Sequence, residues 1–124
     1  MKIYGENTVS IQNILIGEVW LCSGQSNMEW NVKNSNDAEK EIADAAKYPF
    51  IRQIKVTKAI NSLPQNDING GEWLVNNSEN VQDFTAVGYF FAKKLYQELK
   101  VPIGILNISW GGTNIETWIG RDAF

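Results

Sequence analysis

Hydrophobic and polar positions along the chain change period several times, and these changes predict alternating strands and helices. Residues 14–22 are mostly β-branched, aliphatic or aromatic and run directly into Ser23 and Gly24, which is typical of a buried strand followed by a turn. Residues 50–58 alternate apolar and polar positions and predict a second strand. Residues 103–108 predict a third buried strand, which again ends in a glycine-containing turn.

Helical spacing separates these strands. Residues 84–100 carry apolar side chains on one stripe with polar side chains opposite, so we expect a helix whose buried face is formed by Phe84, Val87, Phe91, Leu95 and Leu99. A shorter helix is expected from a capping-box arrangement at residues 36–39 up to Pro49. In the connector before the long helix, the turn signal at residues 69–71 predicts an excursion hairpin with residues 72–75, outside the core sheet.

Strand, helix, strand, helix, strand at these lengths predicts an α/β fold with a parallel sheet and helices on its faces. In open α/β sheets, ligands bind beyond the carboxyl ends of the strands. Two turns are expected at these ends, at residues 23–27 and at residues 111–113. They are therefore the first candidates for a functional site.

The composition of the chain excludes several classes of partner and of catalytic site. A chain of 124 residues with net charge −3 is the size of one domain, and 11 basic against 14 acidic residues make nucleic acid and membrane surfaces unexpected partners. No apolar run is long enough to span a bilayer, and no signal peptide begins at Met1. The single Cys22 excludes an intrachain disulfide and a cysteine zinc site. The chain has no histidine, so no Ser-His or Cys-His pair can be complete within it.

Ser26 is the candidate nucleophile. A serine hydroxyl needs a tight turn that exposes it, a base, and N–H donors for the oxyanion. Gly24 allows the turn, and a helix beginning near Asn27 would direct its free N–H groups at the site. The motif is not a GxSxG elbow, because Met28 replaces the second glycine. The alternative is that Ser23 and Ser26 only cap a helix.

The second turn, residues 111–113, can bring backbone N–H groups close to an anion or a developing oxyanion, although a plain tight loop is the alternative. Lys33, Lys40 and Lys55 are available for a Ser-Lys pair, but all three have polar neighbours. Cys22 lies in an apolar strand and is expected to be a core thiol rather than a nucleophile.

Four blocks of the chain together resemble the sialate O-acetylesterase family of SGNH hydrolases, which is also similar to acetylxylan esterases: residues 17–30 (GEVWLCSGQSNMEW), 87–91, 101–104 and 109–118 (SWGGTNIETW). The resemblance implies a three-layer α/β/α sheet of the flavodoxin-like SGNH type, present only in part. Residues 1–124 would then be a single partial domain, truncated at both ends and lacking the later block that carries the family's Asp and His.

By this resemblance, Ser26 attacks an acetyl carbonyl, and its own N–H group and that of Gly112, or alternatively Gly111, stabilise the oxyanion. Candidate substrate-binding residues within the matching blocks are Gln25, Asn27, Trp30, Thr113, Glu116 and Trp118. Glu29 and Glu116 could hold a substrate hydroxyl or orient a loop, whereas a solvated or cap-bonded carboxylate is the alternative. Neither a metal nor another cofactor is expected.

The expected function is removal of acetyl groups from O-acetylated sugars through an acetyl-serine, with the isolated chain inactive. Acetylxylan-esterase-like specificity and a non-catalytic carbohydrate-binding or assembly module remain alternatives. A third possibility is a two-chain enzyme whose partner supplies Asp and His. An incomplete sheet also predicts self-association. The family resemblance favours a periplasmic or secreted location.

Overall fold

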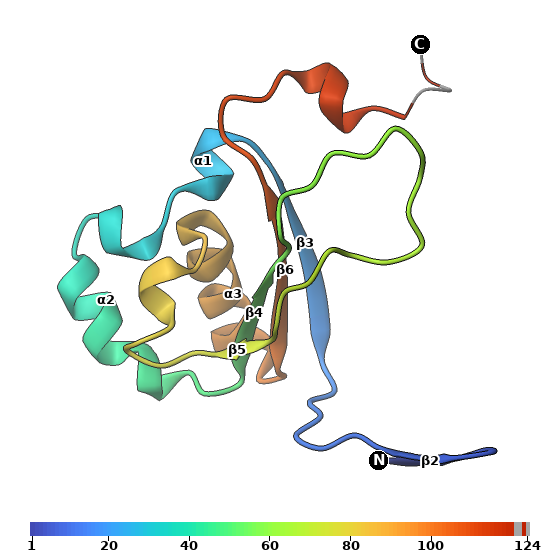
Figure 1. The fold of residues 1–124 in the computed structure, drawn as a ribbon. Coiled ribbons are helices and arrows are strands. Elements are labelled where there is room, and N and C mark those ends of the chain that lie inside the picture. Colours follow the sequence, from blue (N-terminus) through green and yellow to red (C-terminus); the bar gives the residue numbers. More distant parts are fainter. Residues whose placement is uncertain (121–122, 124) are drawn as a thin grey trace.

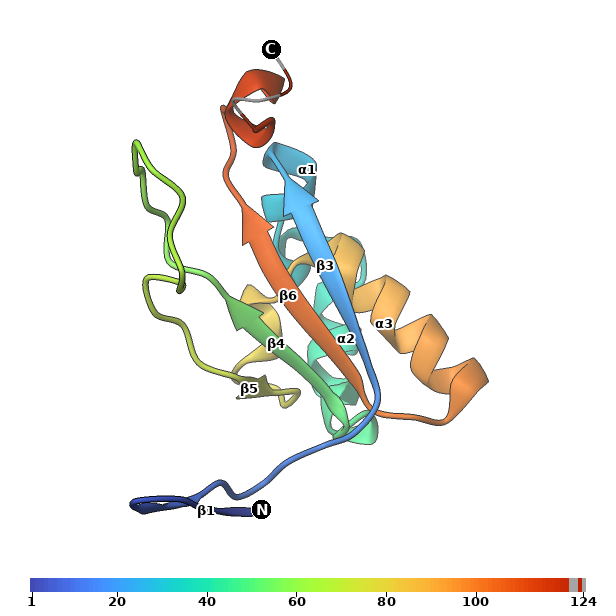
Figure 2. The same cartoon turned by 90° about the vertical axis from the view of Figure 1, so that its right-hand side faces the viewer.

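A four-stranded sheet with the order β3-β6-β4-β5 forms the centre of the computed structural model, which describes residues 1–120 and 123 (Figures 1 and 2). Strands β3 (Glu18–Gly24), β6 (Ile103–Ser109) and β4 (Ile51–Lys55) are parallel, and β5 (Leu74–Val75) pairs antiparallel with β4. The predicted parallel α/β sheet is confirmed. A small hairpin of β1 (Lys2–Tyr4) and β2 (Thr8–Ser10), not predicted, lies below the sheet in Figure 2.

All three α-helices lie on one face of the sheet: α1 (Ser26–Glu29), α2 (Ala38–Asp44) and α3 (Ala86–Leu99) (Figure 2). Short 3-10 turns accompany them, namely η1 (Val32–Asn34), η2 (Ala45–Lys47), η3 (Val81–Asp83) and η4 (Ile115–Trp118). On the opposite face, the ring of Trp73 covers Gly104, and Gly71 packs on Ile54. The described residues therefore supply the sheet and one of the two helical layers expected from the resemblance.

The core lies between the sheet and α3. Side chains along β6 alternate between buried and half-buried positions, and Ile103 and Ile105 face the helix layer. Helix α3 approaches the sheet closely at Gly88, where an added Cβ would lie 3.0 Å from the Cys22 sulfur. A larger side chain at this position would separate the helix from the sheet.

The first strand begins later than the hydrophobic pattern predicts. Residues 14–17 are apolar but lie outside the ladder, because β6 begins at Ile103, opposite Glu18, and offers residues 14–17 no partner. Within the described residues, strand β3 pairs only with β6 and is therefore an edge strand, and Val19 and Leu21 are 64% and 61% exposed.

Three local predictions are corrected. The capping box is wrong: Asp37 precedes α2 with φ of +57° and its side chain makes no cap hydrogen bond. Residues 74–75 do not form an outlying hairpin, because their backbone joins the main sheet beside Arg52 and Gln53.

The face of α3 that packs inward also differs from the prediction. The buried residues of α3 are Ala86, Gly88, Tyr89 and Ala92. Of the predicted stripe, Phe84 is fully buried and Leu95 packs against the core as predicted, whereas Val87, Phe91 and Leu99 are 50%, 40% and 50% exposed. Phe91 meets Trp20 edge to face.

Candidate functional site

Ser26 stands at the carboxyl end of β3, on the turn that the sequence predicts. Gly24 adopts φ of +134°, a conformation that L side chains rarely reach, and the chain then enters the single helical turn α1 with Ser26 as its first residue. The Ser26 side chain is exposed. The preceding residue, Gln25, is the N-cap and makes no side-chain cap bond, so the helix-capping alternative for Ser26 has no support here.

The second predicted turn lies directly beside Ser26 because β3 and β6 are neighbours in the sheet. Gly24 pairs with Ser109, and the Trp110 N–H group donates to the Gly24 carbonyl at 2.9 Å. The following residue, Gly111, is so close to α1 that an added Cβ would lie 3.4 Å from Ser26 Oγ. The parallel ladder thus brings the two turns together (Figure 2).

The two glycines of this turn differ in what surrounds them. The Gly111 N–H group donates to Glu29 Oε2 at 2.6 Å, and a Cβ at Gly111 would lie 2.9 Å from the same oxygen. Gly112 has φ of +78°, and a Cβ there would meet no heavy atom within 4 Å. Gly111 is therefore engaged by the protein, whereas the surroundings of Gly112 are open.

Glu29 is held by positive charge from the last residue of β4 and from the chain that follows this strand. Lys58 Nζ lies 2.5 Å and Lys55 Nζ 3.9 Å from Glu29 Oε1. The Lys58 and Gly111 hydrogen bonds lower the pKa of Glu29 below its ordinary value, so the carboxylate is ionised at neutral pH. Lys58 Nζ also lies over the Trp110 ring, 5.4 Å from its centroid. These contacts connect α1, the connector and the turn after β6.

A cavity of about 500 Å³ opens next to this turn, between residues 56–69 of the connector and residues 108–118. Thr113 and Trp118, both predicted at the site, line it together with Trp110. Trp118 Nε1 donates to Thr113 Oγ1 at 2.9 Å, and this hydroxyl donates to the Trp110 carbonyl at 2.7 Å. The indole of Trp118 is thereby fixed at the wall of the cavity.

The remaining predicted binding residues do not line this cavity. Gln25 and Asn27 flank Ser26 and are exposed. Trp30 is 54% exposed, and its Nε1 donates to the Asn34 carbonyl. Glu116 lies exposed in η4. The fold places Ser26 beside Gly111 and places Thr113 and Trp118 at the cavity next to this turn, whereas Gln25, Asn27, Trp30 and Glu116 do not line the cavity.

No side-chain base hydrogen-bonds to the Ser26 hydroxyl within residues 1–120. Lys33 pairs with Asp83 at 2.7 Å, and Lys55 faces Glu29.

Cys22 is 7% exposed in the core, and burial raises the pKa of its thiol, which agrees with the predicted structural role. In the described part of the chain, no three His, Cys, Asp or Glu residues cluster as metal ligands. None of the described helices combines the length and apolar character needed to cross a bilayer.

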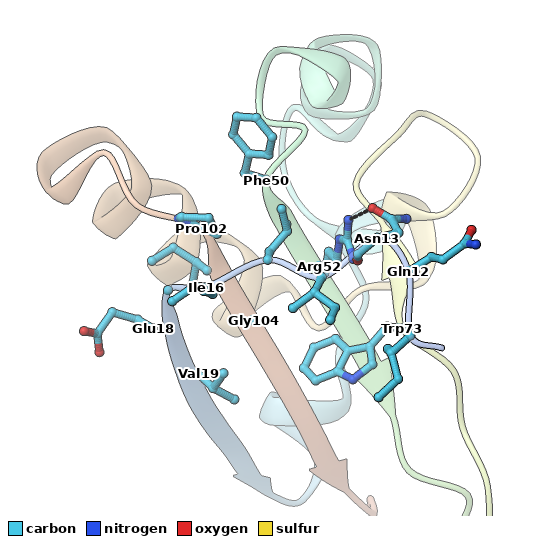
Figure 3. A pocket seen from close by; sticks show the side chains of 15 residues that line it. Gln12, Asn13, Ile16, Glu18, Val19, Phe50, Arg52, Trp73, Pro102 and Gly104 are labelled. Atoms are coloured by element: carbon cyan, nitrogen blue, oxygen red, sulfur yellow. Dashed lines mark hydrogen bonds between the residues drawn. The ribbon is translucent and has the colours of Figure 1, made fainter. Parts of the chain in front are cut away.

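A second cavity, of about 690 Å³, lies at the other end of the strands (Figure 3). It is lined by residues 11–19 and by Phe50, Trp73 and Pro102 among others, and Arg52 closes one side by donating to the carbonyl and side-chain oxygens of Asn13 at 2.8 and 2.6 Å. Because it surrounds the amino ends of β3 and β6, it is remote from Ser26 and separate from the candidate site.

An exposed serine on a strand-to-helix turn, beside a glycine turn from the adjacent parallel strand, is the arrangement of α/β serine hydrolases. A sequence profile of the carbohydrate esterase family "sialic acid-specific acetylesterase" matches residues 16–124, and the chain belongs to this family.

Individual relatives agree with this assignment. Sialate O-acetylesterase of Rattus norvegicus is 39% identical over 94% of this chain and 23% of its own length, and that of Homo sapiens is 36% identical over 90% and 23%. The crystal structure of a carbohydrate acetylesterase from Xanthomonas citri superposes with a TM-score of 0.94 at 41% identity, over 98% of this chain and 28% of that chain. The chain thus spans about a quarter of each relative's length.

The sequence did not reveal the partners of Glu29. Loop orientation by Glu29 is one of the roles that the sequence leaves open, but its partners are Gly111 and Lys58, which are distant in sequence. The pairing of β6 with both β3 and β4 brings these segments together, and no local pattern encodes a contact of this kind.

Proposed function

We propose that this chain carries the nucleophile and the oxyanion turn of a serine carbohydrate O-acetylesterase, which removes acetyl groups from O-acetylated sugars. The observation that carries the proposal is the position of Ser26 beside Gly111, where an added Cβ would lie 3.4 Å from Ser26 Oγ, at the carboxyl ends of two adjacent strands. Membership of the acetylesterase family supports the same chemistry.

In the proposed reaction, Ser26 Oγ attacks the acetyl carbonyl while its proton passes to a general base. The N–H groups of Ser26 and Gly112 donate to the tetrahedral oxyanion. Collapse of this intermediate breaks the bond to the sugar oxygen, which leaves protonated as the free hydroxyl, and water then hydrolyses the acetyl-serine. No metal is required by this scheme.

These 124 residues contain no histidine, and no described side chain hydrogen-bonds to the Ser26 hydroxyl as a base. We propose an Asp-His pair, supplied either by further residues of the same polypeptide or by a complementing chain. The exposed apolar side chains of Val19 and Leu21 on the edge strand are consistent with such a covering segment. The isolated chain is then expected to hydrolyse acetyl esters very slowly.

The sugar is proposed to bind in the cavity beside Thr113 and Trp118. An indole face at a cavity wall is suited to stacking on a sugar ring, and Gln25 and Asn27, exposed on either side of Ser26 in the chain, would donate to its hydroxyls. An acetylated sialic acid is the favoured substrate, and acetylated xylan is the alternative.

Acetate release from an acetylated sialic acid and from acetylated xylan tests this function in the protein that contains the Asp-His block. Ser26→Ala should abolish turnover, whereas Ser78→Ala, an exposed serine before η3, should leave it unchanged. Equal activity of the wild type and Ser26→Ala would refute the proposed nucleophile. Rapid turnover by the 124-residue chain alone would refute the need for an external base.

A second candidate function, carbohydrate binding without catalysis, is favoured by the absence of histidine together with the cavity at Trp118. Sugar binding by the chain alone, measured by isothermal titration calorimetry, distinguishes the two. A binding module predicts saturable binding that Ser26→Ala leaves intact and Trp118→Ala or Trp30→Ala weakens, with no acetate release from the longer protein.

A further inference from the structure

We infer that Glu29 is a positioning residue of the oxyanion turn: it engages the Gly111 N–H group and thereby makes Gly112 the donor that the turn offers to substrate. The inference rests on the proposed function for its catalytic meaning. The contact between Glu29 and Gly111 stands independently of that function, and it can be measured without any turnover.

Glu29 and the nucleophile belong to the same rigid unit. Helix α1 consists of residues Ser26–Glu29, and the Trp30 N–H group closes this turn on the Ser26 carbonyl at 3.0 Å. A carboxylate at the end of one helical turn therefore moves with the hydroxyl at its start. By binding Gly111, Glu29 fixes the distance between the nucleophile and the turn after β6.

The charge of Glu29 also decides which N–H group can meet a developing oxyanion. Glu29 Oε2 accepts from Gly111 at 2.6 Å, so an oxyanion that used the same donor would lie next to a carboxylate. Two negative charges at such a distance repel each other strongly in a partly desolvated site. Among the described residues, the Gly112 N–H group donates to no acceptor, and a Cβ at Gly112 would meet no heavy atom within 4 Å, so this N–H group remains available.

Lys58 and Lys55 make this arrangement compatible with a reaction in which negative charge develops on the carbonyl oxygen. Both ammonium groups face Glu29 Oε1, at 2.5 and 3.9 Å, on the side of the carboxylate away from Gly111. They compensate the Glu29 charge without occupying the turn. Lys58 additionally lies over Trp110, the residue that precedes Gly111, and so holds the turn from its other side.

The first test follows backbone amides of the 124-residue chain by ¹⁵N-resolved NMR during an acid titration. The Gly111 amide should shift as Glu29 is protonated, with a midpoint below the ordinary glutamate value, and the Gly112 amide should move less. Glu29→Gln should remove this titration, whereas Glu116→Gln, at an exposed acid of η4, should leave it unchanged. A Gly111 amide that does not titrate with Glu29 in the folded chain would overturn the inference.

The second test measures acetyl ester hydrolysis in the protein that contains the Asp-His block. Because small displacements of catalytic groups cost up to about a hundredfold in rate, Glu29→Ala should lower kcat by roughly 10- to 100-fold with little change in KM. Glu29→Gln retains an oxygen acceptor for Gly111 but loses the pair with Lys58, so its kcat should fall between those of the wild type and Glu29→Ala.

A folded Glu29→Ala variant with wild-type kcat would overturn the inference while leaving Ser26 as nucleophile. If the wild-type protein released no acetate at all, the proposed function would fail instead. The amide titration would still decide whether Glu29 holds Gly111.

Discussion

Ser26 and Gly111 lie so close together that the site has no room for a side chain at Gly111. A Cβ atom added to Gly111 would lie 3.4 Å from Ser26 Oγ and 2.9 Å from Glu29 Oε2. This proximity follows from the pairing of β3 and β6, which places Gly24 opposite Ser109 just before the two turns. Gly111 is therefore required because a side chain would not fit, whereas Gly112 is required because its backbone has a positive φ.

Gly111→Ala should reduce esterase activity of the protein that contains the Asp-His block by more than about tenfold, since displacement of an oxyanion donor costs up to 10²–10³ in kcat. The methyl group would push the turn away from Glu29 and Ser26. Gly112→Ala is the matched comparison, because it adds backbone strain without a steric clash and should cost less. Circular dichroism would verify folding, and a Gly111→Ala variant more active than Gly112→Ala would contradict this explanation.

Gly88→Ala should lower the free energy of unfolding by about 1–3 kcal/mol, the usual cost of overpacking a core. Its Cβ would lie 2.6 Å from Thr85 Cγ2 and 3.0 Å from Cys22 Sγ, where α3 crosses the sheet. Denaturant titration measures the change. Gly5→Ala serves as the control, because an added Cβ there meets only the Asn7 carbonyl at 3.8 Å, and a similar loss of stability in both variants would argue against a steric cause.

Tyr89 should titrate well above the ordinary range of a tyrosine phenol. Its side chain is fully buried, and burial, aided by the negative charge of Glu41, raises its pKa to about 12. In the unfolded chain the phenol titrates near 10, so this group reduces stability as pH rises from about 10 towards 12 and has no such effect below 10. Ultraviolet difference spectra of the wild type and Tyr89→Phe assign the step, and a Tyr89 step near 10 in the folded chain would contradict burial.

The Cys22 thiol should react slowly with alkylating reagents in the folded chain. It is 7% exposed against α3, and burial raises its pKa, so little thiolate forms at neutral pH. Denaturant should restore rapid modification, monitored by mass spectrometry. A Cys22→Ala/Ser78→Cys variant, with an exposed thiol, should react rapidly under native conditions, and equal rates for the two proteins would contradict a core position.

Self-association of the isolated chain should depend on the edge strand β3. Leu21 is 61% exposed on this strand, which pairs on one side only, so another copy or a covering segment can dock there. Leu21→Lys should shift the sedimentation velocity distribution towards monomer. Leu63→Lys, at a 69% exposed leucine in the connector, should have little effect, and a wild-type chain that is monomeric at high concentration would contradict the prediction.

The sequence predicts those parts of the fold whose pattern is local and misses those that depend on distant partners. Hydrophobic runs identify β3 and β6, an alternating pattern identifies β4, and Gly24 identifies the turn at Ser26. The start of β3 is mispredicted because strand length is decided by where Ile103 begins to pair. The buried face of α3 is mispredicted in part: Phe84 and Leu95 do pack inward, but the close approach at Gly88 selects the face that meets the sheet, and Phe91 packs on Trp20 at the edge.

The candidate functional site shows the same contrast between features set by local sequence and features set by distant partners. Ser26 and the glycine turn are predicted from their places at strand ends, and Thr113 and Trp118 do line a cavity beside that turn. Trp30 stands apart from this cavity because the short α1 turn directs the chain towards η1, where Trp30 bonds to the Asn34 carbonyl. A motif specifies which residues are adjacent in the chain, and the sheet decides which of them face the same space.

The seven-residue ladder between β3 and β6 has a consequence for how this site can change in evolution. Inserting or deleting one residue within either strand would shift the register and separate Ser26 from the turn of residues 111–112. The connector of residues 56–73 obeys no such restriction, although it forms one wall of the cavity beside that turn. Relatives that differ in the sugars they accept are therefore expected to vary in the length and composition of this connector while keeping both strands at constant length.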